Sequence, residues 1–131
     1  MKLLLDTHIW LWMLQKHDKL GRTARRHVES AKTELYLSPV SIWEAHHLKR
    51  GKRLRITQSF PEWLEQVLSR VPLREAPFNF AVATAASGLE LPQSDFGDVL
   101  LAATALVFDL TLVTADAQLL DCAWLKPLPN E

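Results

Sequence analysis

The sequence Leu3-Leu4-Leu5-Asp6-Thr7-His8 lies close to the N-terminus. Three consecutive leucines followed by polar residues are typical of a short strand with both faces buried, so a strand is predicted over residues 2–6. Asp6 falls where this strand ends, and ligands of open α/β sheets bind outside the carboxyl ends of the strands. A carboxylate beside a buried sheet is costly unless it is paired or binds a metal. We therefore interpret Asp6 as the first ligand of a metal site.

The composition favours one globular domain over residues 1–131. Hydrophobic residues make up 48% of the chain, which excludes a disordered protein. Lys+Arg and Asp+Glu balance at 15 each, so any signal for nucleic acid must come from local clusters of charge. The single cysteine, Cys122, the lack of a secretory signal and the lack of a long apolar stretch predict a cytoplasmic protein with no membrane partner.

Strand and helix patterns alternate along the chain. Strands are predicted over 2–6, 34–38, 72–77, 110–114 and 124–128, and helices over 7–15, 22–31, 40–49, 60–70, 80–87 and 99–108, with a turn over 92–97. This alternation predicts an α/β fold with a mostly parallel central sheet and helices on both faces. The first helix is apolar nearly all round. Core burial is therefore expected for at least one of Trp10 and Trp12, and the rest of that surface could meet a second subunit or a partner protein.

Four acidic residues are predicted to meet at one edge of the sheet. Asp6 and Asp116 each follow an apolar strand, and Glu44 and Asp98 each lie near the start of a helix. Oxygen ligands without cysteine or paired histidines favour Mg²⁺ or Mn²⁺ over zinc. One or two such ions can polarise a phosphodiester, activate water and stabilise the leaving oxygen, which is the chemistry of a nuclease.

Each acid also has an ordinary structural explanation. Asp6 could cap a helix, Glu44 could be an exposed helical acid, Asp98 could complement the helix dipole, and Asp116 could be a turn residue. These four separate explanations together account poorly for four acids that four different elements bring to the same edge of the sheet. Asp95, three residues before Asp98, is expected to cap the helix that follows.

The densest basic cluster surrounds the end of the third predicted helix. Its members are Lys49, Arg50, Lys52, Arg53 and Arg55. Such a cluster is either a rim that binds RNA phosphates or a set of cations that complements a helix C-terminus, and the two functions are compatible.

Four blocks of the sequence resemble the PIN domain, and more narrowly the VapC-type toxins of type II toxin–antitoxin pairs. The resemblance covers almost the whole chain in the right order. The blocks are Leu3-Leu-Leu-Asp6-Thr7-His8-Ile-Trp10-Leu-Trp12, Ser41-Ile42-Trp43-Glu44, Asp95-Phe-Gly-Asp98-Val-Leu-Leu-Ala-Ala-Thr104-Ala and Leu112-Val113-Thr114-Ala115-Asp116.

The resemblance implies a three-layer α/β/α sandwich and a Mg²⁺- or Mn²⁺-dependent endoribonuclease. It also implies a homodimer and inhibition by a small cognate antitoxin. Carried over residue by residue, the metal-binding and catalytic set is Asp6, Glu44, Asp98 and Asp116, and Thr114 matches a hydroxyl at the end of a strand.

Four positions depart from the pattern of many relatives, and two of them are His46 and His47, which replace small or aliphatic residues after the glutamate. Phe96 follows Asp95 where a proline is common, and Val99 follows Asp98 where an arginine is common. The missing arginine keeps open a catalytically impaired PIN-like module that binds RNA. A phospho-acceptor signalling domain is the other alternative, but it would need a lysine near the last acid, and Lys126 lies well past Asp116.

Overall fold

The computed structural model describes residues 1–91 and 95–131. In the described residues, one parallel sheet has the strand order β3-β2-β1-β4-β5, with β1 at its centre. This confirms the predicted parallel sheet. The strands are β1 (Lys2–Leu5), β2 (Glu34–Leu37), β3 (Arg74–Glu75), β4 (Thr111–Thr114) and β5 (Leu128–Pro129).

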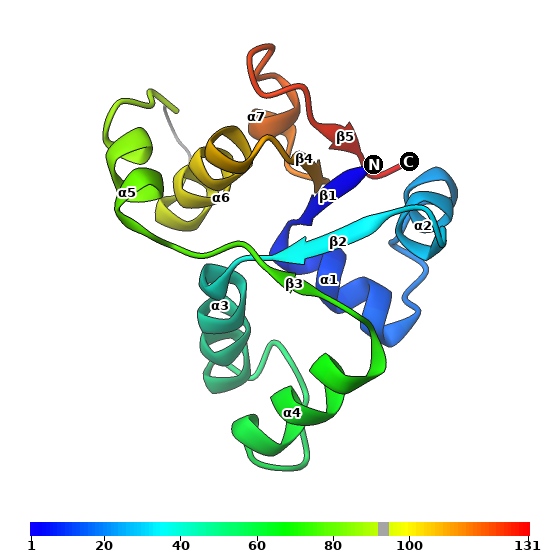
Figure 1. Ribbon diagram of the computed structural model, residues 1–131. Coiled ribbons are helices and arrows are strands. Elements are labelled where there is room, and N and C mark those ends of the chain that lie inside the picture. The colour runs from blue at the N-terminus through cyan, green and yellow to red at the C-terminus, as the bar shows by residue number, and fades with distance from the viewer. Residues whose placement is uncertain (92–94) are drawn as a thin grey trace.

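Helices cover both faces of this sheet (Figure 1). The three-layer α/β/α arrangement is the one predicted. The helices are α1 (Thr7–Gln15), α2 (Arg22–Glu29), α3 (Pro39–Arg50), α4 (Phe60–Arg70), α5 (Phe80–Ser87), α6 (Phe96–Phe108) and α7 (Ala117–Leu120). None of those helices combines the length and apolar character needed to cross a membrane.

The three leucines of β1 divide between two hydrophobic clusters. Leu3 and Leu5 pack with residues of α1 to α4, whereas Leu4 packs with residues of α6 and α7. Successive side chains of a strand point to opposite faces. An uninterrupted leucine run is therefore what a strand covered on both sides requires.

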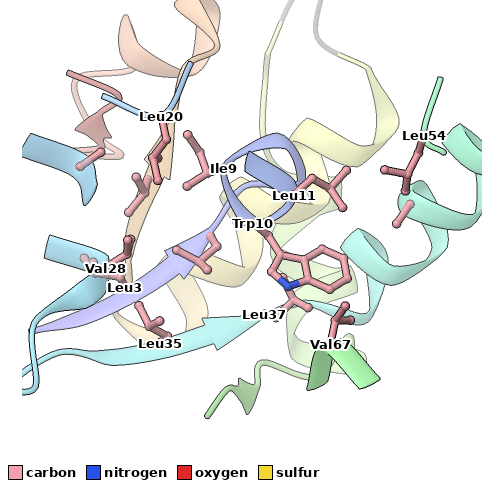
Figure 2. Packing of buried hydrophobic residues seen from close by; sticks show 14 residues of the cluster. Leu3, Ile9, Trp10, Leu11, Leu20, Val28, Leu35, Leu37, Leu54 and Val67 are labelled. Atoms are coloured by element: carbon pink, nitrogen blue, oxygen red, sulfur yellow. The ribbon is translucent and has the colours of Figure 1, made fainter. Parts of the chain in front are cut away.

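Trp10 belongs to the core. It reaches from α1 into the cluster that contains Leu3 (Figure 2). Its ring lies 5.7 Å from the ring of Trp63. It is fully buried, which confirms that at least one of Trp10 and Trp12 belongs to the core. The surface of α1 that could meet a second subunit or an antitoxin therefore does not include Trp10. Trp12, two residues later, is half-buried.

Several boundaries differ from prediction for local reasons. Helix α6 begins at Phe96 rather than Val99, because Asp95 caps it by accepting a hydrogen bond from the Asp98 N–H at 2.8 Å, as expected for Asp95. Strand β3 is shorter than 72–77, which begins and ends in prolines that cannot donate to a sheet.

The last strand begins later in the chain than the predicted range 124–128. A turn closed by the hydrogen bond from the Leu125 N–H to the Cys122 carbonyl (3.0 Å), with Lys126 left-handed at φ 50°, occupies most of 124–128. Strand β5 therefore starts only at Leu128. Residues 92–94 of the predicted turn lie outside the described residues.

Candidate metal centre

The four predicted acids line one cleft, at the edge where the strands end. Asp6 directly follows β1, and Asp116 follows β4 by two residues. Glu44 projects from α3, which continues from β2, and Asp98 lies in the first turn of α6. The cleft has a volume of about 920 Å³, and all four side chains form part of its wall. Residues far apart in the sequence thus meet as predicted.

Asp6 is the most buried of the four acids, and two hydrogen bonds fix its carboxylate. One oxygen accepts from the Thr7 N–H at 2.7 Å and so caps α1, and the other accepts from the Thr114 hydroxyl at 2.6 Å. Thr114 in turn accepts a hydrogen bond from the Asp116 N–H at 3.0 Å. Burial raises the pKa of Asp6, and the hydrogen bonds from Thr114 and Thr7 oppose that rise.

Glu44 is held by a neighbour of Asp6. The Thr7 hydroxyl donates to Glu44 Oε1 at 2.6 Å and lies 2.9 Å from Ser41 Oγ. Because a hydroxyl carries one proton, Ser41 must donate to Thr7 when Thr7 donates to Glu44. Burial raises the pKa of Glu44, and the hydrogen bond from Thr7 opposes this effect.

Gly97 allows α6 to pass close to Glu44. A Cβ atom at this position would lie 2.5 Å from Glu44 Oε2, a distance that real contacts do not show. The glycine therefore lets the first turn of α6, which carries Asp98, pack directly against the Glu44 carboxylate of α3.

Asp98 shows that the cleft holds more negative charge than its protein partners neutralise. Its pKa is raised to about 7, first by burial and then by the surrounding carboxylates, which are those of Asp95, Asp116, Asp6 and Glu44. The salt bridges found in the described part of the chain join other residues, Arg25 with Glu29 and Arg74 with Glu34. A cluster of carboxylates without a paired cation fits a divalent ion in chemistry and in charge.

The carboxylates do not yet converge on one point. Across residues 1–91 and 95–131, no three acidic, histidine or cysteine side chains are close enough together to hold an ion as they stand. Asp116, for example, accepts hydrogen bonds from the Gln118 and Leu119 N–H groups at 2.9 and 3.2 Å and so caps α7. Coordination of one ion by several of these acids would therefore require side-chain rotation within the cleft.

The basic cluster contributes less to the cleft than its density indicated. Of its five members only Arg53 lines the cleft, and Lys49 instead lies 3.4 Å from the Gln58 carbonyl oxygen, to which it donates. Lys19 lines the cleft from the loop between α1 and α2. It shares this polar loop with Lys16, and no local pattern distinguished it.

Several other residues of the cleft wall were not singled out as site residues. They are His8, Trp43, His47 and Phe96, each within three residues of one of the four acids. Their closeness in sequence to a predicted acid was the signal that could have identified them. Trp12, the half-buried tryptophan of α1, also forms part of the wall.

Residues 3–125 match the family described as PIN domain. The chain belongs to the PIN-domain family. This PIN domain is 29% identical over 119 residues to "Ribonuclease VapC22" of Mycobacterium tuberculosis, a match that covers 88% of each chain.

Two solved structures share its fold. One is VapBC2 from Rickettsia felis bound to a promoter DNA fragment, with a TM-score of 0.70 and 19% identity over 98% of this chain and 97% of that chain. The other is a toxin–antitoxin complex from Klebsiella pneumoniae, with a TM-score of 0.65 and 18% identity over 92% of each chain. These likenesses confirm the fold class.

Proposed function

We propose that this PIN domain is a Mg²⁺- or Mn²⁺-dependent endoribonuclease and the toxin of a type II toxin–antitoxin pair. The observation that carries the proposal is the cleft in which four elements assemble four carboxylates that no lysine or arginine of the described residues neutralises by a salt bridge. Membership of the PIN family and the 29% identity to a ribonuclease support it.

Asp6, Glu44 and Asp98 would hold the cation, and Asp116 would complete or support the site. When bound, the cation supplies positive charge that polarises a phosphodiester and makes water a stronger nucleophile. Thr114 and Thr7 fix the orientation of the Asp6 carboxylate, and Thr7 also fixes that of Glu44. With a pKa of about 7, Asp98 is only partly ionised at neutral pH, so a cation would displace the proton from the remaining molecules as it binds.

The cations of the cleft wall fit an RNA substrate. Lys19 and Arg53 lie on the same cleft as the four acids. Their positive charges would attract phosphates that an acidic floor alone would repel. The hypothesis places the scissile phosphate over the carboxylates and its neighbouring phosphates on these two side chains.

A cognate antitoxin and a second copy of the chain are the proposed protein partners. Support for the antitoxin is that the structures sharing this fold include VapBC and toxin–antitoxin complexes. The second copy is proposed from the resemblance to VapC-type toxins. Expression of the chain alone should arrest bacterial growth, and co-expression of its antitoxin should relieve the arrest. Light scattering of the purified chain should give twice the monomer mass. Growth unaffected by expression would contradict the toxin role.

The enzymatic test uses purified protein and total cellular RNA with Mg²⁺, with Mn²⁺ or with EDTA. The expected result is discrete fragments that form with either metal and are absent with EDTA. Asp98→Asn should abolish cleavage, whereas Asp109→Asn should retain it. Asp109 is a matched control because it lies at the opposite end of α6, and asparagine tolerates its left-handed backbone at φ 53°.

Cleavage that persists in EDTA, or full activity in Asp98→Asn, would contradict the proposal. RNA binding without cleavage in any metal would favour the impaired binding module instead. Val99 in place of the common arginine is the residue that motivates this alternative.

A further inference from the structure

Two exposed aromatic side chains flank the acids of the cleft. Trp43 directly precedes Glu44 on α3 and is 69% exposed, and Phe96 is the first residue of α6, two before Asp98, and is 84% exposed. Both line the cleft. A single exposed aromatic residue needs no explanation. Two of them beside two candidate ligands of the same cleft indicate a surface that contacts the substrate.

Trp43 is held in place by a row of rings. Its ring lies 5.5 Å from that of His46, which lies 5.1 Å from Phe60. Phe60 lies 5.4 Å from Trp63, whose ring contacts the buried Trp10. The outermost ring is therefore anchored through its neighbours to the core. A ring fixed in this way loses little conformational freedom when a flat ligand stacks on it.

The charges of the cleft indicate what the aromatic residues bind. Lys19 and Arg53 offer positive charge to phosphates, while Trp43 and Phe96 offer flat apolar surfaces to bases. A groove with cations for the backbone and aromatic rings for the bases is the usual arrangement for binding single-stranded nucleic acid. A duplex does not present free base faces, because its bases are paired and stacked inside it.

We propose that Trp43 and Phe96 stack on bases next to the scissile phosphate and so position the RNA strand over the carboxylates. The inference rests on the proposed ribonuclease function and adds the residues that hold the bases of its substrate. Trp43 holds a base beside Glu44, and Phe96 holds a base beside Asp98.

The test measures binding rather than cleavage. In EDTA and in the Asp98→Asn background nothing is cut, so fluorescence anisotropy can report the affinity of a labelled oligoadenylate. Trp43→Leu and Phe96→Leu should each weaken binding about 5- to 100-fold, the range for loss of one stacked base. Neither should change the affinity for an abasic oligonucleotide of equal length. Trp43→Tyr, which keeps a ring, should restore most of the affinity.

Matched controls lie away from the cleft. Phe80 is the first residue of α5, as Phe96 is of α6, and it is 93% exposed, while Trp124 is an exposed tryptophan that does not line the cleft. Phe80→Leu and Trp124→Leu should bind like the parent.

Unchanged affinity of Trp43→Leu and Phe96→Leu for oligoadenylate would overturn the inference and leave these rings as a surface for protein docking. An equal loss on the abasic backbone would also overturn it. None of these results bears on metal-dependent cleavage by the unaltered protein. Failure of the stacking proposal is therefore distinguishable from failure of the proposed function.

Discussion

Thr7 joins two candidate metal ligands that lie 38 residues apart in the sequence. Its N–H donates to Asp6 and its hydroxyl donates to Glu44, so one residue orients carboxylates from the β1–α1 junction and from α3. That the four acids line one cleft could be predicted, because each follows a strand or lies in the first two turns of a helix. The role of Thr7 could not, because its partner is fixed only by how α1 and α3 pack.

Gly97 provides a test of close packing in the site. In Gly97→Ala the new methyl group would displace the Glu44 carboxylate, because it would lie 2.5 Å from Oε2. Loss of a group that orients a ligand typically weakens metal affinity about 10- to 100-fold. We expect that loss in a calorimetric titration with Mn²⁺.

The matched control is Gly88→Ala, since a Cβ atom there would meet only the Ala85 carbonyl oxygen at an ordinary 3.7 Å. Equal Mn²⁺ affinity in Gly97→Ala and Gly88→Ala would show that Glu44 is not a ligand or can move away without loss.

The raised pKa of Asp98 predicts how the free energy of unfolding depends on pH in the absence of metal. Folding raises its pKa from 3.8 to about 7, so between these values the folded state binds more protons than the unfolded state. The free energy of unfolding should therefore fall as the pH rises through this window and stay low above it. Burial likewise raises the pKa of Asp6 and Glu44, which act in the same direction.

Urea unfolding in EDTA at about pH 5 and about pH 8 measures this dependence. Asp98→Asn should show a smaller fall in the free energy of unfolding between these conditions than the unaltered protein. Mg²⁺ should restore stability at the higher pH, because it binds the folded state. An equal fall in both proteins would contradict the charge balance derived for the cleft.

Capping residues determined how well the elements could be predicted. Helices α4 and α5 lie over the predicted ranges, 60–70 and 80–87, and their N-cap residues Ser59 and Asn79 are of the types that favour helix starts. The last strand was misplaced because Leu125 satisfies the apolar pattern of a strand while the chain around it turns into the core. Local sequence cannot distinguish these two uses of a leucine.

Helix α2 has a cap that is distant in sequence. Its N-cap, Gly21, has no side chain, and the main-chain oxygen of Glu131 instead accepts from the Thr23 and Ala24 N–H groups. Asn130 accepts from the Gly21 N–H and donates to the Lys19 carbonyl, both at 2.7 Å. The C-terminal segment therefore holds the loop that carries Lys19 into the cleft.

Asn130→Ala should lower the free energy of unfolding by about 1–3 kcal/mol, because it leaves two backbone groups without their partner. Asn130→Asp keeps the acceptor for Gly21 and should lose less. Chemical denaturation of the two variants beside the unaltered protein measures both effects. Equal stability of all three would show that water replaces these hydrogen bonds without loss.

At the scale of the whole molecule, the alternation of strands and helices was enough to predict a parallel sheet and the edge at which the acids meet. The order β3-β2-β1-β4-β5 was not predictable, because it depends on which connections between strands cross over the sheet. The composition of the cleft wall was not predictable either, because it depends on how the loops pack at the edge of the sheet. Lys19 and Arg53 line the cleft with the acids, whereas the rest of the basic cluster does not.

The central claim is that four carboxylates from four segments form one cation site. Crystals soaked in Mn²⁺ and measured for anomalous scattering test it most directly. The predicted result is a strong anomalous peak in the cleft, within ligand distance of Asp6 and Asp98 and of at least one of Glu44 and Asp116. The peak should be lost in Asp98→Asn crystals. An empty cleft at millimolar Mn²⁺, or a peak elsewhere on the molecule alone, would contradict the account.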